Sequence, residues 1–205
     1  MTGPVLEALT VADPPEAWRV AGFAVAGRAC QVGAVRLQLG AEGGGVTTWS
    51  FSGIGGGGDI DGLPTAELPT EPAATASHPN GALSLDHLVV TSHDVERTVA
   101  AMVARGLEPR RRWVSDGRCY TFFRVGEAIL ELIGPEKPDG NTRPARFYGL
   151  AFTVADIDAT AVLLGGRLGR VKDALQPGRR IATLRPDAGL STAVAFMSAG
   201  PGAIP

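Results

Sequence analysis

The sequence ALTVAD at residues 8–13 recurs as AFTVAD at residues 151–156 and, in register with both, as VVTSHD at residues 89–94. In each copy a β-type run ends at an aspartate, whose carboxylate can accept hydrogen bonds from the free N–H groups at the start of a helix. The repeat therefore predicts one structural unit that is present three times.

The residues after each aspartate predict the same order of elements in all three copies. Pro14 and Pro15 stand where proline is tolerated at a helix start, and residues 95–105 and 157–164 carry apolar residues at helical spacing. Three β-type runs follow each helix, so each unit is predicted to be βαβββ. These runs cover residues 24–32, 34–39 and 46–52, then 110–115, 119–125 and 128–133, then 169–174, 180–185 and 192–198.

Two segments rich in glycine or proline separate the units. Residues 54–83 contain six glycines and four prolines without apolar periodicity, which predicts a linker, and a shorter connector covers residues 135–146. The expected organisation is an N-terminal module at 1–53, a second module at 84–134 and a third at 147–199 that pairs with the second. The fold class expected is α+β.

Composition narrows the classes of function. The 205 residues are 44% hydrophobic and 20% charged with a net charge of −2, which favours a globular chain and argues against nucleic acid as a partner. No apolar run approaches the roughly 20 residues that a membrane helix needs. Two well-separated cysteines and an N-terminus without signal-peptide features predict a cytoplasmic protein, and the preference for arginine over lysine indicates a GC-rich, bacterial genome.

Two motifs carry a resemblance to a known family. LDHLVV at residues 85–90 leads to DVERT at residues 94–98, and AILELIGP covers residues 128–135. This arrangement resembles the vicinal oxygen chelate superfamily, which includes glyoxalase I, bleomycin-resistance proteins, methylmalonyl-CoA epimerase and extradiol dioxygenases. The resemblance implies that two βαβββ modules join into an open sheet that forms a cup around the functional site.

The same resemblance assigns His87 and Glu131 as ligands of a divalent metal that chelates two adjacent substrate oxygens. Strand alternation places His87 on one face with Val89 and Thr91, so its side chain and that of Glu131 can project into one cup. The two residues also form a candidate acid–base dyad, with Glu131 as a base toward a carbon acid.

The partner module does not repeat this ligand pair. Matching the aspartates places Gly149 opposite His87 and either Phe196 or Met197 opposite Glu131. In the first module the same matching places Leu6 opposite His87 and either Ser50 or Phe51 opposite Glu131. Two protein ligands hold a divalent ion weakly, so the residues leave open both one divalent metal ion and no metal.

Tyr120, Phe122 and Arg124 share one face of a predicted strand and are the candidate substrate-binding residues, because an aromatic wall with one guanidinium suits a small organic acid. Arg179 follows a Gln-Pro-Gly turn and is interpreted either as a solvated edge residue or as a contact for phosphate or carboxylate near the cup mouth. His93 is expected in solvent and His78 in the linker.

The sequence leaves open two functions that use the cup and, as a third possibility, an interaction protein whose cup is vestigial. The first is a glyoxalase-like enzyme, a lyase, isomerase or dioxygenase, that acts on a small oxygen-bearing metabolite around His87 and Glu131. The alternative is a binding protein similar to bleomycin-resistance proteins, which sequesters a small molecule without catalysis. The N-terminal module is expected either to pack on the other modules or to pair with its copy in a homodimer.

Overall fold

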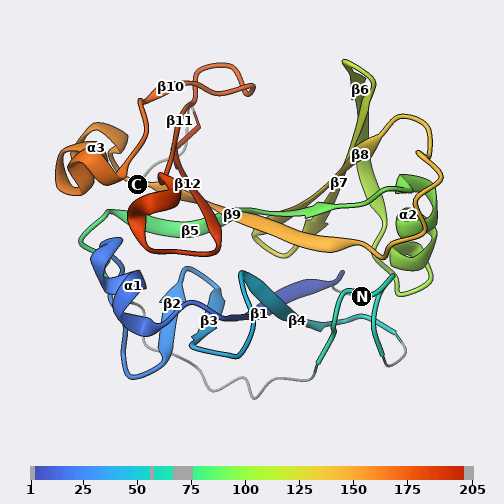
Figure 1. The fold of residues 1–205 in the computed structure, drawn as a ribbon, viewed down its shortest axis with the longest axis horizontal. Coiled ribbons are helices and arrows are strands. Elements are labelled where there is room, and N and C mark those ends of the chain that lie inside the picture. Colours follow the sequence, from blue (N-terminus) through green and yellow to red (C-terminus); the bar gives the residue numbers. More distant parts are fainter. Residues whose placement is uncertain (1–2, 56–57, 67–75, 201–205) are drawn as a thin grey trace.

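The computed structural model describes residues 3–55, 58–66 and 76–200. The strands form a four-stranded sheet of order β2-β3-β1-β4 and an eight-stranded sheet of order β10-β11-β12-β9-β5-β8-β7-β6. The larger sheet curls so that β6 to β8 rise on one side and β10 to β12 on the other, with the smaller sheet packed beneath (Figure 1).

Each unit contributes strands and one α-helix. The first holds β1 (Val5–Val11), α1 (Pro15–Val20), β2 (Ala29–Val32), β3 (Val35–Leu39) and β4 (Val46–Ser52). The second holds β5 (Ala82–Thr91), α2 (Val95–Val103), β6 (Pro109–Ser115), β7 (Arg118–Val125) and β8 (Ala128–Pro135). The third holds β9 (Arg146–Val154), α3 (Ile157–Leu164), β10 (Lys172–Asp173), β11 (Arg180–Thr183) and β12 (Ala193–Ser198). Within the described residues, no helix has the length and apolar character needed to cross a membrane.

The second and third units build the cup in the way the sequence predicts. β5 runs antiparallel to β9 at the centre, and each of these strands lies parallel to the last strand of its own unit, β8 or β12. The α+β fold with two paired βαβββ modules is therefore confirmed.

The repeated aspartate has two different roles. Asp94 accepts a hydrogen bond from the backbone of Arg97, and Asp156 accepts two from the first turn of α3, so both cap their helices as predicted. Asp13 does not cap α1, where Pro14 is the N-cap residue. Its buried carboxylate instead accepts hydrogen bonds from the backbone and hydroxyl groups of residues 191 and 192, which joins the first unit to the start of β12.

The first unit pairs its strands differently from the other two. β3, not β4, is the parallel neighbour of β1, and β4 lies on the opposite edge of β1 in antiparallel pairing. Relative to β1, β3 therefore lies where β8 lies relative to β5. β4 lies on the other side of β1, where β9 lies relative to β5. Loop lengths after the helix differ among the units, so counting β-type runs along the sequence does not reveal this exchange.

The strand register corrects the sequence matching to Glu131. In the second unit Glu131 lies beside Val89, five residues before the repeated aspartate. In the third unit the residue five positions before the aspartate is Ala151, and its neighbour in the sheet is Ala195. Ala195 is therefore the counterpart of Glu131, and the match to Phe196 or Met197 was wrong. In the first unit the residue five positions before the aspartate is Ala8, and its parallel neighbour is Arg36. The match to Ser50 or Phe51 was therefore also wrong. The register of two parallel strands depends on the path of the chain that connects them. The number of residues between the aspartate and the last strand does not determine that path.

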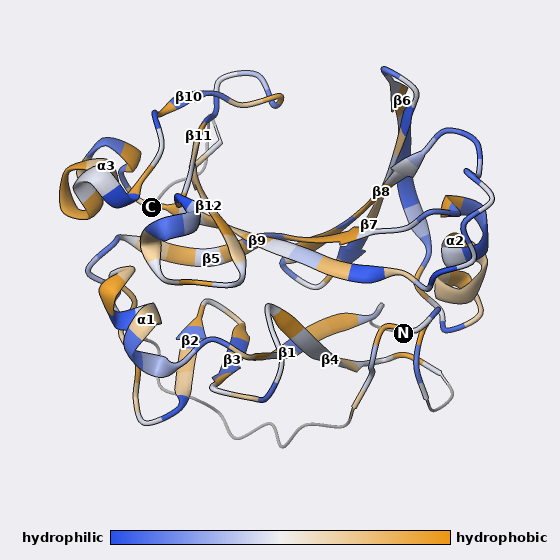
Figure 2. Ribbon diagram, in the orientation of Figure 1, coloured by the Kyte–Doolittle hydropathy of each residue, from blue (hydrophilic) through white to orange (hydrophobic). Residues whose placement is uncertain are grey.

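The first unit covers the face of the large sheet that lies opposite the cup. Phe23 contacts Trp18, Phe152 and Phe196, with ring centroids 4.9, 5.0 and 5.9 Å away, and Trp49 contacts Phe147 at 5.1 Å. Apolar residues from both sheets face each other across this layer (Figure 2). Of the two arrangements expected for the first unit, packing within the chain is the one observed.

The segment predicted to be a linker is partly built into the core. Ile60 and Leu63 are buried, and Trp49 donates a hydrogen bond from Nε1 to Thr65 Oγ1 at 2.6 Å. Asn80 is buried as well, and residues 82 and 83 already belong to β5. Apolar residues that lack periodicity can still fill gaps between sheets, which the pattern does not reveal. Residues 67–75 of this segment lie outside the described residues.

The aromatic layer predicts that both sheets unfold together. Phe23→Ala removes a ring that bridges α1 and the large sheet, and we expect it to lower the free energy of unfolding by about 4 kcal/mol in a single transition. Urea denaturation followed by fluorescence and by circular dichroism measures this change. Leu175→Ala, at an exposed position, is the control and should change the free energy little. Separate transitions for the two sheets would contradict the prediction.

Candidate functional site

A β-bulge in β5 places two polar side chains side by side on the floor of the cup. The register with β9 shifts between Leu85 and His87, so that Asp86 has no direct partner in β9. The extra residue interrupts the alternation of the strand. As a result Asp86 Oδ1 accepts a hydrogen bond from His87 Nδ1 at 2.9 Å, and the side chains are only 11% and 15% exposed.

Asp86 is also held from the third unit. Its Oδ2 accepts hydrogen bonds from Thr153 Oγ1 at 2.6 Å and Arg179 Nη2 at 2.5 Å, while Arg179 Nε donates to the carbonyl of Ser198 at 2.8 Å. Burial alone would raise the pKa of Asp86, but the hydrogen bonds from His87, Arg179 and Thr153 outweigh burial and hold the pKa well below its usual range. Asp86 is therefore a fixed negative charge that joins the two modules.

His87 presents its other ring nitrogen to Glu131. Because Asp86 accepts from Nδ1, the tautomer assigned from this hydrogen bond leaves Nε2 facing Glu131, with 3.6 Å between Nε2 and Oε2. This separation suits an ion pair and is longer than a good hydrogen bond. The structure thus lines up a carboxylate, an imidazole and a second carboxylate along the floor of the cup.

The strand pattern of β8 explains why Glu131 is a partly buried acid. Leu130 and Leu132 are fully buried on one face, whereas Ile129, Glu131 and Ile133 alternate with them on the cup face. The Glu131 side chain is 16% exposed. Burial raises its pKa and the negative charge of Asp86 raises it further, while the positive charge of His87 opposes both effects.

The three predicted substrate-binding residues do not behave alike. Tyr120 and Phe122 are half-buried in β7, with Phe122 next to Glu131 in the sheet register and Tyr120 stacked on Trp113 at 5.1 Å. Arg124 lies near the hairpin at the end of β7, is exposed, and donates from Nε to the carbonyl of Gly126 at 2.7 Å. The structure therefore places the rings of Tyr120 and Phe122 on the wall of the cup, whereas the guanidinium of Arg124 contacts its own hairpin.

Close strand packing explains why the third unit offers no counterpart to His87. A Cβ atom added to Gly149 would lie 2.5 Å from the carbonyl oxygen of Ala193 in β12, so no side chain fits at this position. Ala151, which pairs with His87, and Ala195, which pairs with Ala151, also face the cup and carry only methyl groups as side chains. The polar groups of the floor therefore come mainly from one side of the cup.

These residues do not fit the metal site that the resemblance implies. Among the described residues, no group of three or more His, Cys, Asp or Glu side chains is placed to hold a metal ion. His87 and Glu131 are two candidate ligands, and both oxygens of Asp86 already accept hydrogen bonds. Open metal sites generally use three protein ligands, so we assign no step to a metal.

The remaining histidines lie outside this group. His93 pairs with Asp139, with 2.7 Å between Nδ1 and Oδ2. His78 is buried in a structural role: its Nδ1 accepts from the backbone of Ala24 at 3.0 Å and its Nε2 lies 2.9 Å from the carbonyl of Gln31. Burial lowers the pKa of His78. Its position in the core differs from the linker position that the sequence predicts.

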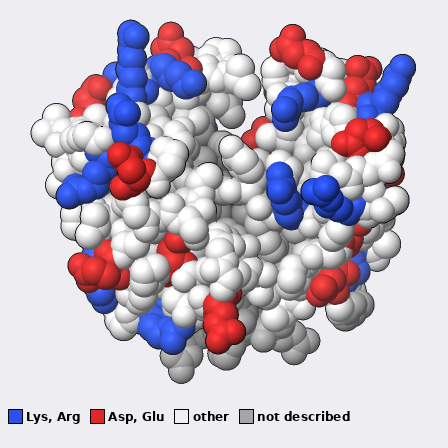
Figure 3. All heavy atoms as spheres, in the orientation of Figure 1, with Lys and Arg blue, Asp and Glu red and all other residues white. Residues whose placement is uncertain are grey.

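Sequence reasoning missed Asp86 and Thr153 and left Arg179 undecided. A signal for the bulge exists, since two polar residues in succession, Asp86 and His87, interrupt the alternation of the strand between Leu85 and Leu88. Arg179 reaches Asp86 from 93 positions away in the chain, which spacing does not predict. Figure 3 shows that the surface is hollowed between the two arms of the large sheet.

Comparison with solved structures identifies the fold. A methylmalonyl-CoA epimerase from Mycobacterium tuberculosis superposes with a TM-score of 0.50 at 18% identity, covering 63% of this chain and 95% of that protein. The chain has the fold of the vicinal oxygen chelate superfamily. A Streptomyces coelicolor methylmalonyl-CoA epimerase in complex with 2-nitronate-propionyl-CoA matches with a TM-score of 0.49 at 21% identity, over 60% of this chain and 99% of its own. No family model matches the sequence, and no curated protein matches it.

The hydrogen bonds of Asp86 predict a pH-dependent contribution to stability. Its folded pKa lies below the ordinary 3.8, so its stabilisation is present above that pH and is lost as the pH falls toward the folded pKa. Asp86→Asn should lower the free energy of unfolding by about 2 kcal/mol at pH 7, and less below pH 4.

Urea denaturation between pH 3 and pH 8 measures the effect. Asp187→Asn, at an exposed position, is the matched control. An equal loss in both variants, or a loss from Asp86→Asn that does not shrink in acid, would contradict the role assigned to Asp86.

Proposed function

We propose that the protein binds a small carbonyl compound in the cup and transfers a proton at the carbon next to the carbonyl group, with Glu131 as the base and His87 as the acid. The observation that carries the proposal is the pair formed by Glu131 and His87, with 3.6 Å between Oε2 and Nε2, in which Glu131 is partly buried between Ile129 and Ile133 on the cup face of β8.

Electrostatics supports this division of roles. A carboxylate facing an unprotonated ring nitrogen would bring two lone pairs together, so the pair favours holding one proton. A base with a raised pKa accepts a proton from carbon more readily than an ordinary carboxylate at the same ionisation. Asp86, which accepts from Nδ1, stabilises the positive charge on His87.

The reaction balances with these two groups alone. Glu131 takes the proton from the carbon, the electron pair of the broken C–H bond forms the enol double bond, and His87 Nε2–H donates a proton to the carbonyl oxygen. Once the enol has turned its opposite face toward Glu131, return of the proton from Glu131 to the same carbon and of the enol proton to His87 Nε2 re-forms the carbonyl group and gives the epimer. Among the enzyme classes expected from the sequence, this chemistry corresponds to an isomerase.

The fold is compatible with this proposal. The solved structure that superposes with a TM-score of 0.50 is named as an epimerase. The identity of 18% supports the shared fold only, so the substrate of that protein is a candidate to test here rather than an assignment. The cytoplasmic location and a homodimer stay predictions from the sequence.

Glu131→Gln provides the direct test. Wild-type protein in D2O should exchange the acidic hydrogen of at least one compound in a panel of carbon acids, with methylmalonyl-CoA included, as measured by NMR. We expect Glu131→Gln to slow this exchange at least 100-fold, because the amide cannot accept the proton. Glu127→Gln, in the exposed hairpin before β8, is the control and should exchange at the wild-type rate. Full exchange by Glu131→Gln would disprove the role of the base.

The same assay addresses the metal. The donor set does not fit a three-ligand site, so prolonged dialysis against EDTA should leave the exchange rate unchanged. Metal analysis of the dialysed sample by mass spectrometry provides the control. A loss of exchange that returns on adding one divalent ion would contradict proton transfer by these side chains alone.

A binding protein is the second candidate function. The observation that favours it is the stacked pair of Trp113 and Tyr120 on one arm of the cup, because aromatic walls bind flat ligands without any chemistry. In that case Trp113→Ala should weaken ligand binding while Glu131→Gln keeps it, and no compound should exchange hydrogen. Thermal shift and NMR measured on the same panel separate the two functions.

A further inference from the structure

A separate cavity lies beyond the floor of the cup. It has a volume of about 470 Å³ and is formed by the ends of β5 and β8, the turn between β6 and β7, and the connector before β9. Three arginines line it, namely Arg118, Arg143 and Arg146. None of these residues takes part in the contacts of Asp86, His87 or Glu131 described above.

The cavity begins next to the proposed base. Val89 pairs with Glu131 in the sheet, and the next pair on the same face is Thr91 with Ile133, both of which line the cavity. Two residues along a strand span about 7 Å. A molecule of modest length can therefore place one end in the cavity and another beside Glu131.

The charges in the cavity favour an anion. Arg146 donates from Nε to Thr91 Oγ1 at 3.2 Å, and no described residue forms a hydrogen bond or ion pair with the guanidinium of Arg118 or Arg143. Of the two acids in the lining, Asp139 is paired with His93, and the pKa of Asp139 is lowered by that contact. Asp116 accepts a hydrogen bond from Ser115 Oγ at 3.0 Å, so three guanidinium groups face two carboxylates that both already have partners.

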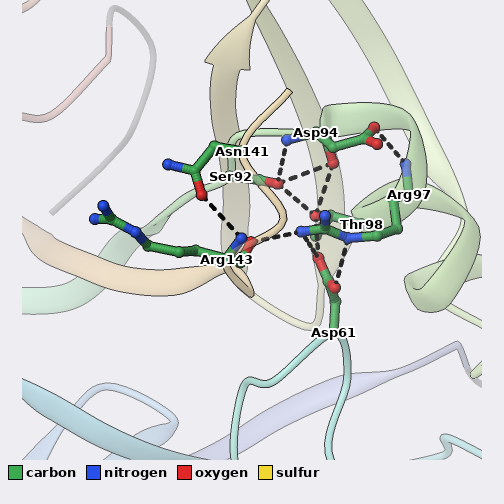
Figure 4. Close-up of polar contacts among 7 residues, drawn as sticks. All are labelled: Asp61, Ser92, Asp94, Arg97, Thr98, Asn141 and Arg143. Carbon is green, nitrogen blue, oxygen red and sulfur yellow. Dashed lines mark hydrogen bonds and ion pairs between the residues drawn. The ribbon is translucent and has the colours of Figure 1, made fainter. Parts of the chain in front are cut away.

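The backbone of Arg143 is fixed while its side chain is left free. Its N–H donates to Asn141 Oδ1 at 3.0 Å, and its carbonyl accepts from Arg97 Nη2 at 2.9 Å. Arg97 is itself anchored by Asp61, with 2.8 Å between Nε and Oδ1. Figure 4 shows the side chain of Arg143 extending away from this network. Because the backbone is already fixed, binding of an anion has to order only the side chain of Arg143.

We propose that this cavity binds the anionic group, a carboxylate or a phosphate, of the substrate whose carbon faces Glu131. The inference rests on the proposed function and adds the substrate class: an organic acid or phosphate ester whose anionic group lies at least about 7 Å from its acidic carbon, because the cavity begins two residues along the strand from Glu131. The bidentate geometry of arginine suits both anions.

The test measures anion binding without any turnover. Inorganic phosphate and malonate are titrated separately into the protein at low ionic strength by NMR, and the anion that binds more tightly identifies the preferred group. We expect Arg143→Gln to weaken binding of that anion at least fivefold and Arg118→Gln to weaken it similarly. Arg170→Gln, an exposed arginine outside the cavity, is the control and should bind as the wild type.

Binding that is lost equally in Arg170→Gln, or no binding of either anion at millimolar concentration, would overturn the inference. Glu131→Gln distinguishes it from the proposed function, because that variant should bind the anion normally while losing hydrogen exchange. Normal exchange by Glu131→Gln with anion binding lost in Arg143→Gln would overturn the role of the base and keep the anion site.

Discussion

The burial of one face of β5 and β9 by the four-stranded sheet is the interaction on which the rest of the structure depends. Leu88, Val90 and Phe152 point into this layer with the aromatic rings of the first unit. Because side chains of a strand alternate, the same contact directs the other set of residues into the cup. The first unit thus provides the core against which a polar floor can be held.

The polar floor is asymmetric for a steric reason. The cup is built from two modules of the same topology, yet the close approach of β12 leaves no space for a side chain at Gly149. The third module instead contributes Thr153 and Arg179, which both donate hydrogen bonds to Asp86, and the guanidinium of Arg179 balances its charge. One module therefore supplies the reactive pair and the other supplies the charge balance that keeps this pair oriented.

Charge is also separated along the cup. The acids Asp86 and Glu131 lie on the floor, where one is held ionised by hydrogen bonds and the pKa of the other is raised by burial. The arginines of the cavity lie beyond Thr91 and Ile133, the pair of strand residues that follows Val89 and Glu131 on the same face. An anionic ligand is attracted to the arginines and repelled by the carboxylate of Glu131, so this arrangement would orient such a ligand in one direction.

The sequence by itself determined the repeated unit and the α+β class, because strand alternation, helix caps and glycine turns are local properties of the chain, whereas the cup followed only from the resemblance to the vicinal oxygen chelate superfamily. The sequence also placed His87 and Glu131 on strand faces that can meet. Only the tertiary structure decided that Asp13 binds the residues just before β12 instead of capping a helix, that β3 takes the place expected for β4, and that Arg179 reaches Asp86. Register and long-range ion pairs depend on how separate segments pack together, and no spacing within one segment specifies that packing.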